Sequence, residues 1–213
     1  MRYSLACGLV SLVPLFLFTG AAPVAVAAEA SLSVKDGYGV TLNPGGDDAS
    51  TFVLKGQGIR EVTLEVVALS GERATTCATI THSWAKDKAG EEGQILLVYK
   101  RQADDQIVPF LGFGVRRGAG SFGGRVVKVK EKRLGSFRPA AGRGLTPKGK
   151  HLIEIAVFAD KDGEKHFRDS VKDAESFTAA MKTLRSFGDV KAWAKKNPKV
   201  TVVMLSLSWL PAE

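Results

Sequence analysis

The side chains best suited to do chemistry in this sequence are the Lys and Arg residues between positions 116 and 150. This segment holds eleven basic residues against the single acid Glu131, so its net charge is +10. A dense group of cations on a glycine-rich chain suits a polyanion such as lipid phosphates or an acidic polysaccharide. We therefore take seven residues as candidates for binding an anionic ligand: Arg116, Arg117, Arg125, Lys128, Lys130, Lys132 and Arg133.

Alternation of residue types predicts one strand over residues 123–133. In an extended strand Lys128, Lys130 and Lys132 share a face at intervals of about 6.6 Å. A structural explanation competes with this one, because lysines on an exposed edge strand also prevent sheets from aggregating. Aromatic residues for base stacking are sparse, with only Phe122 and Phe137 in the segment, so we do not expect sequence-specific nucleic-acid binding.

Other motifs give weaker signals. Residues 118–123 have the glycine spacing of a dinucleotide site, but a strand pattern follows instead of the required helix, so a hairpin loop is favoured. Residues 160–164 have the composition of a calcium loop, yet its first ligand position falls on Phe158, which cannot coordinate. We expect a turn there, joining strands at 153–159 and 165–171. The three histidines lack metal-ligand spacing, so we predict no metal and no cofactor.

A catalytic constellation is not recognisable. No Gly-x-Ser-x-Gly elbow occurs, and the paired acids lie in polar turns. We assign no catalytic residue and favour a non-enzymatic function. An exported hydrolase with dispersed acids or a Ser/His pair remains the alternative, because distant carboxylates can converge on folding.

The N-terminus predicts export. Arg2 precedes an apolar stretch at 5–18 and small residues up to Ala28, the pattern of a cleavable signal peptide. Cleavage there leaves a mature chain of net charge +7 and removes Cys7, so that Cys77 is the remaining cysteine. We expect Cys77 to be a small buried residue. No later segment reaches the roughly 20 apolar residues of a spanning helix, so we expect a periplasmic or secreted protein.

Most of the mature chain has the two-residue period of strands. The composition, with 45% hydrophobic and 24% charged residues, is that of a folded protein. Short strands separated by turn residues favour an antiparallel β-sandwich. The expected strands before residue 134 are 31–35, 38–42, 51–55, 58–69, 75–84, 94–101, 107–117 and 123–133, and residues 134–149 are expected to form a loop.

The period changes after residue 171. Apolar residues three and four positions apart predict a helix from Asp173 to Gly188, and a second short helix at 190–196 with Asp189 as its cap. An apolar strand is expected at 200–209. The predicted organisation is a signal peptide at 1–28, a β-sandwich at 29–171, and a helix-helix-strand extension at 172–213 packed on the same domain.

One local pattern adds a family resemblance. Leu145, Pro147, Gly149 and the aromatic His151, followed by an alternating strand, resemble the start of a late strand in immunoglobulin-like and fibronectin-III-like domains. The resemblance implies such a fold around residues 145–168 and carries no activity, because these sandwiches host many functions.

These observations favour an exported, non-catalytic β-sandwich that binds or organises an envelope or extracellular partner. The expected ligand is an anionic lipid or polysaccharide at the basic segment. A protein partner or a homo-oligomer is the other expectation, in which the strand at 200–209 would add to a neighbour's sheet.

Overall fold

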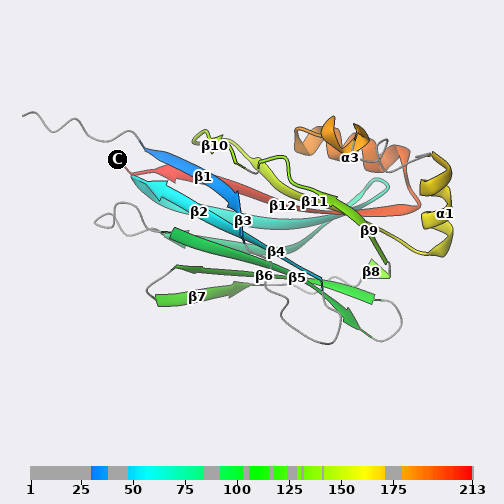
Figure 1. Ribbon diagram of the computed structural model, residues 1–213, viewed down its shortest axis with the longest axis horizontal. Helices are drawn as coiled ribbons and strands as arrows, with labels where there is room; N and C mark the ends of the chain where they lie inside the picture. The colour runs from blue at the N-terminus through cyan, green and yellow to red at the C-terminus, as the bar shows by residue number, and fades with distance from the viewer. Residues whose placement is uncertain are drawn as a thin grey trace, which may run out of the picture.

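The computed structural model describes residues 30–37, 48–83, 92–102, 106–115, 118–123, 129–130, 132–140, 142–170 and 179–212. The chain is mainly β, with two antiparallel sheets and few helices (Figure 1). The predicted signal peptide at 1–28, the strand at 38–42 and the helix cap Asp173 lie outside the described residues.

Sheet A has the strand order β10-β1-β2-β5-β6-β7, and β8 also pairs with β6. All of its pairings are antiparallel. Its strands are β1 (Ser31–Asp36), β2 (Asp48–Gln57), β5 (Glu92–Gln102), β6 (Gln106–Val115), β7 (Gly118–Gly123), β8 (Val129–Lys130) and β10 (Gly144–Leu145).

Sheet B has the strand order β4-β3-β12-β11-β9, again antiparallel throughout. Its strands are β3 (Ile59–Ser70), β4 (Arg73–Ser83), β9 (Lys132–Phe137), β11 (His151–Ala159) and β12 (Val200–Pro211). The strand predicted at 200–209 is confirmed, but it is no appendage. It is the central strand of sheet B, hydrogen-bonded to β3 on one side and to β11 on the other.

The two sheets share a buried core, which gives a sandwich-like arrangement. The alternation predicted in β3 is confirmed, because Val62, Leu64 and Val66 are buried and belong to the same cluster as Phe52 and Leu97 of sheet A. Burying these side chains provides the main favourable contribution to folding, roughly 1.5–3 kcal/mol for each fully buried Val, Leu or Phe.

The outer face of sheet B carries the helices (Figure 1). They are α1 (Lys161–Ser170) and α3 (Phe187–Lys196), and residues 179–182 are also helical. Val190 and Ala194 of α3 join a second buried cluster with Val202 and Met204 of β12. The helices therefore cover a sheet face that would otherwise expose apolar side chains.

The hairpin predicted across residues 160–163 is wrong, because helix α1 starts there. The side chain of Asp160 accepts a hydrogen bond from the Gly163 amide at 2.7 Å, as an N-cap does, and two acids follow in the first turn. Gly163 is required for packing, since a Cβ at this position would overlap the carbonyl oxygen of Lys199. A turn and a helix start favour the same residue types, and the sequence did not separate them.

The boundaries predicted for the C-terminal helices are also wrong. Ser186 is the N-cap of α3, and Asp189, three residues later, closes a capping box in which each side chain accepts from the other residue's amide. Gly188 thus lies in the first turn of α3 and does not end the preceding helix. The predicted end of α3 before Asn197 is confirmed.

Two segments predicted as loops contain strands. The expected glycine-rich loop at 118–123 is strand β7, paired with β6, and the expected loop after residue 134 contains part of β9 and all of β10. Among the described residues, no helix is both long enough and apolar enough to cross a membrane.

Candidate functional site

The predicted row of lysines does not lie on one strand. Lys130 lies in β8, which pairs with β6 in sheet A, whereas Lys132 lies in β9, which pairs with β11 in sheet B. The single strand predicted at 123–133 is therefore wrong, because the backbone passes from one sheet to the other between these two residues. Alternation specifies an extended chain but not the sheet that it joins. Arg116, Arg117, Arg125 and Lys128 lie outside the described residues, as do the side chains of Lys130 and Lys132.

Arg133 points into the protein. Its Nη2 atom donates to Oε1 of Glu154 at 2.8 Å, and its side chain is 17% exposed. The guanidinium also lies over the ring of Tyr99, 5.0 Å from the centroid. Of the seven candidate residues, Arg133 is the one whose side chain is described. Its charge is paired with a buried acid of the same chain, Glu154.

Glu154 is the buried acid that receives this charge. Its side chain is fully buried, on the face of β11 that meets sheet A, and its Oε1 atom also accepts a hydrogen bond from Oγ of Ser50 at 2.9 Å. Burial raises the pKa of the Glu154 carboxyl, because it removes the charged form from water. The Arg133 charge, the Ser50 hydroxyl and the Arg138 charge oppose that rise in the pKa.

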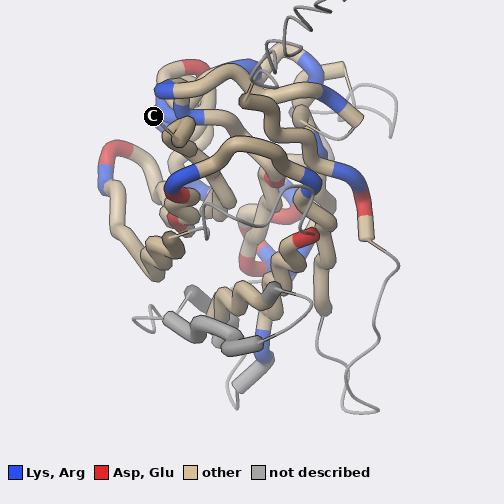
Figure 2. The backbone as a smooth tube through the Cα atoms, turned by 90° about the vertical axis from the view of Figure 1, so that its left-hand side faces the viewer, with Lys and Arg blue, Asp and Glu red and all other residues tan. Residues whose placement is uncertain are grey.

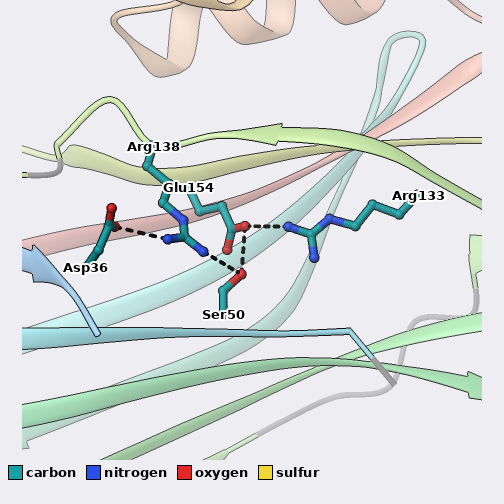
Figure 3. A network of polar contacts seen from close by, with 5 residues as sticks. All are labelled: Asp36, Ser50, Arg133, Arg138 and Glu154. Atoms are coloured by element: carbon teal, nitrogen blue, oxygen red, sulfur yellow. Dashed lines mark hydrogen bonds and ion pairs between the residues drawn. The ribbon is translucent and has the colours of Figure 1, made fainter. Parts of the chain in front are cut away.

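Arg138 extends the same group of contacts to the edge of the molecule. Its Nη1 atom lies 3.2 Å from Oδ1 of Asp36, and its Nη2 atom donates to Oγ of Ser50 at 3.4 Å. Figure 3 shows the resulting buried charge network: Asp36, Ser50, Arg133, Arg138 and Glu154. The network ties β1 and β2 of sheet A to β9 and β11 of sheet B.

This network places a hydroxyl beside a carboxylate with a raised pKa, a combination that enzymes use. However, Ser50 and Glu154 are 1% and 0% exposed, so a dissolved substrate reaches neither group in this structure. The network also contains two cations and two acids, which balance. Its contacts therefore support a role in holding the sheets together.

A second cluster of charge, the basic pocket, lies beside this network. It has a volume of about 240 Å³ and is bounded by the chain after Arg138, by the start of β11 and by the turn before α3. Its lining contains three cations and one histidine but no Asp or Glu. The lining residues are Pro139, Ala140, Arg143, Gly144, Leu145, Lys150, His151, Leu152 and Arg185.

The cations of the basic pocket differ in their surroundings. Lys150 pairs with Glu65 and lies over the Phe187 ring, 5.2 Å from the centroid. For Arg143 and Arg185, no carboxylate of the described residues lies within ion-pair distance. Of the three cations in the lining, Lys150 therefore has an acidic partner, whereas Arg143 and Arg185 have none in the described part of the chain.

Backbone contacts hold the walls of the basic pocket in place. The Gly142 amide donates to the Val34 carbonyl at 2.9 Å, and the Val34 amide donates to the Arg143 carbonyl at 3.4 Å, which fixes the loop against β1. His151 is oriented by the contact between its Nε2 atom and the Thr146 carbonyl at 2.8 Å. Because a carbonyl only accepts, Nε2 carries the proton.

Elsewhere in the described part of the chain, basic and acidic residues lie on the same helices and strands. Figure 2 shows Lys and Arg distributed over several elements and interspersed with Asp and Glu. The described part of the basic segment is thus divided between inward cations, such as Arg133 and Arg138, and pocket cations, such as Arg143 and Lys150.

Cysteine and histidine chemistry has little support in the described residues. Cys77 is fully buried, as predicted, and burial raises the pKa of its thiol to about 11, so the unreactive thiol form dominates at neutral pH. The ring of His82 packs against the ring of Phe113, with 5.1 Å between the ring centroids. No group of three or more His, Cys, Asp or Glu side chains able to hold a metal occurs within the described ranges.

Sequence reasoning missed Glu154 and Arg185. Glu154 carried a usable signal, because a lone acid inside the apolar run of β11 requires a buried cation as partner. Arg185 lies far along the chain from Arg143, and no spacing rule connects the two.

Comparisons with protein-family models, with curated proteins and with solved structures found no match.

Proposed function

We propose that this chain is an exported β-sandwich protein that binds an anionic partner outside the cytoplasm, without catalysing a reaction. The two antiparallel sheets with a shared core support a sandwich fold. We further propose that this sandwich is of the immunoglobulin-like or fibronectin-III-like type. The signal-peptide pattern supports export to the periplasm or the cell exterior. The partner is an anionic lipid or polysaccharide of the envelope.

The observation that carries the proposal is the basic pocket. Arg143 and Lys150, both from the basic segment, meet Arg185 there, and no acidic side chain lines the pocket. A concave site with one sign of charge concentrates ligands of the opposite sign. The function therefore rests on a place where cations converge, in addition to the high count of cations in the segment.

Two other functions have less support from the contacts. A hydrolase needs an accessible acid or nucleophile, and the Ser50–Glu154 pair is buried. Homo-assembly by strand addition through residues 200–209 needs a free edge, and both edges of β12 are hydrogen-bonded within the chain. Neither function has an observation in its favour among the described residues.

Retention on vesicles tests the binding. We expect the protein to bind vesicles rich in phosphatidylglycerol at low salt and to dissociate as salt rises, because surface charges are screened. Changing Arg143, Lys150 and Arg185 together to Glu should abolish retention. The matched control reverses three exposed lysines that do not line the basic pocket, Lys161, Lys182 and Lys191, and should retain most of the binding.

Equal loss in both triple variants would show that only net charge matters and would reject the assignment to the basic pocket. Export is tested separately by sequencing the N-terminus of the protein recovered outside the cytoplasm, which should begin at Glu29. An intact Met1 on the recovered protein would contradict the predicted cleavage.

A further inference from the structure

The positive charge of the basic pocket's lining determines the negative charge of a ligand that would neutralise it. Arg143 and Arg185 have no carboxylate partner among the described residues, whereas Glu65 neutralises Lys150. Arg143 and Arg185 thus bring an uncompensated formal charge of +2 to the lining. A monoanion such as a carboxylate or a sulfate ester leaves half of that charge unpaired. A phosphomonoester carries about −1.5 to −2 charges at pH 7 and matches it.

We propose that the basic pocket is a binding site for one phosphomonoester group, held between Arg143 and Arg185. Guanidinium groups present parallel N–H donors that fit phosphate oxygens in pairs, and such contacts are among the stronger hydrogen bonds in proteins. This inference rests on the proposed function, because it names the chemical group that the anionic partner would insert.

The size of the pocket fits a phosphate with a small organic group attached. Its volume of about 240 Å³ equals that of roughly eight liquid waters. Pro139, Ala140, Leu145 and Leu152 supply apolar wall, which suits the carbon skeleton of a ligand better than free inorganic phosphate. The ligand is therefore an organic phosphate, with its charged end at the two arginines.

The nearby helix end does not bind this anion. Helix α3 begins just after Arg185, but Asp189 already accepts from the Arg185 and Ser186 amides, at 3.1 and 2.8 Å. These bonds instead fix the backbone from which the Arg185 side chain extends. The specificity of the pocket thus depends on side-chain cations brought together from separate elements.

Calorimetric titration of the purified protein at pH 7.5 and low salt tests the proposal, with phenyl phosphate, phenyl sulfate and benzoate as probes of equal ring size. Phenyl phosphate should bind most tightly. Arg143→Gln and Arg185→Gln should each weaken its binding about tenfold, equivalent to about 1.4 kcal/mol. Lys182→Gln, an exposed cation three residues before Arg185 that does not line the pocket, should change the dissociation constant less than twofold.

A second pair of variants removes no native contact. A Cβ at Gly144 meets no heavy atom within 4 Å, so Gly144→Asp and Gly144→Asn should both fold and differ only in charge. Gly144→Asp should bind phenyl phosphate more weakly than Gly144→Asn. Thermal unfolding with and without ligand gives an independent measure, because a ligand that binds the folded state raises the melting temperature.

Several outcomes would overturn the inference. Equal affinity for phenyl phosphate and phenyl sulfate would reject the phosphomonoester. Equal weakening by Arg143→Gln and Lys182→Gln would reject the pocket. Binding to phosphatidic acid vesicles without binding to phenyl phosphate would show that a membrane surface, and not the single group, is recognised. The first and the third results leave the binding of an anionic partner intact, so they separate this inference from the proposed function.

Discussion

Replacing Arg133 by methionine should reveal the energetic role of the buried charge network. The change keeps a long apolar side chain but removes the cation that lies 2.8 Å from the fully buried Glu154. Removing one partner of a buried ion pair costs about 3–5 kcal/mol, because the remaining charge stays desolvated. We expect a loss of that size in the free energy of unfolding at pH 8.

The loss should depend on pH in a defined direction. Burial raises the pKa of Glu154, and the Arg133 charge is the strongest influence opposing that rise, so the pKa should rise further in Arg133→Met. A carboxyl whose pKa is higher in the folded than in the unfolded state stabilises the fold below the unfolded pKa, about 4.3 for Glu. It loses that stabilisation as the pH rises through the folded pKa. The defect should therefore be smaller at pH 5 than at pH 8.

Urea unfolding at several pH values provides the measurement. The double variant Arg133→Met, Glu154→Gln should recover most of the stability at pH 8, because it removes the unpaired charge. Arg138→Met is the matched control. Its partner Asp36 is half exposed, so the lost pair should cost about 1 kcal/mol or less. A cost below 1 kcal/mol for Arg133→Met at pH 8, or an equal cost at pH 5, would refute the reasoning.

Three further variants and one labelling reaction test the packing. Gly163→Ala should lower the free energy of unfolding by about 1–3 kcal/mol, because its Cβ overlaps backbone. Gly188→Ala, whose Cβ finds its nearest contact at 3.6 Å, should raise the free energy of unfolding by about 0.4–1 kcal/mol in the same urea assay. The Cys77 thiol should react with a disulfide reagent only as fast as the protein unfolds, and rapid labelling of the native protein would contradict its burial. Trp209→Phe leaves the Leu145 carbonyl without the indole donor at 3.1 Å and should cost about 1–3 kcal/mol in urea unfolding; an unchanged midpoint would show that this bond contributes nothing.

The strands were predictable because their local pattern and their burial agree. In β3, Val62, Leu64 and Val66 alternate with polar residues in the sequence and all point into the shared core. Strand β12 was predictable for a different reason: its continuous apolar run is buried on both faces, by the opposite sheet and by the helices. Where only one face is buried, as in β3, the two-residue period fixes the orientation of the strand.

The remaining features depend on contacts between distant residues. Asp160 and Gly163 are residue types that suit a turn as well as a helix start. The close approach between the Gly163 backbone and the Lys199 carbonyl, which requires the glycine in α1, cannot be read from the local sequence. The alternation around Lys130 predicts an extended chain but cannot show that it changes sheets. The basic pocket was inaccessible to sequence reasoning for the same reason, since Arg143 and Arg185 meet only through the packing of α3 against sheet B.

The central place of β12 also constrains when this protein can fold. Oγ of Ser206 in β12 donates to the carbonyl of Glu65 in β3, which lies 141 positions earlier in the chain. During synthesis, β3 must wait for residues 200–211 before sheet B can be completed, and such long-range pairing is slow. Until those residues are present, the edge of β3 that pairs with β12 lacks its partner, and the apolar side chains of sheet B lack the central strand that they pack beside.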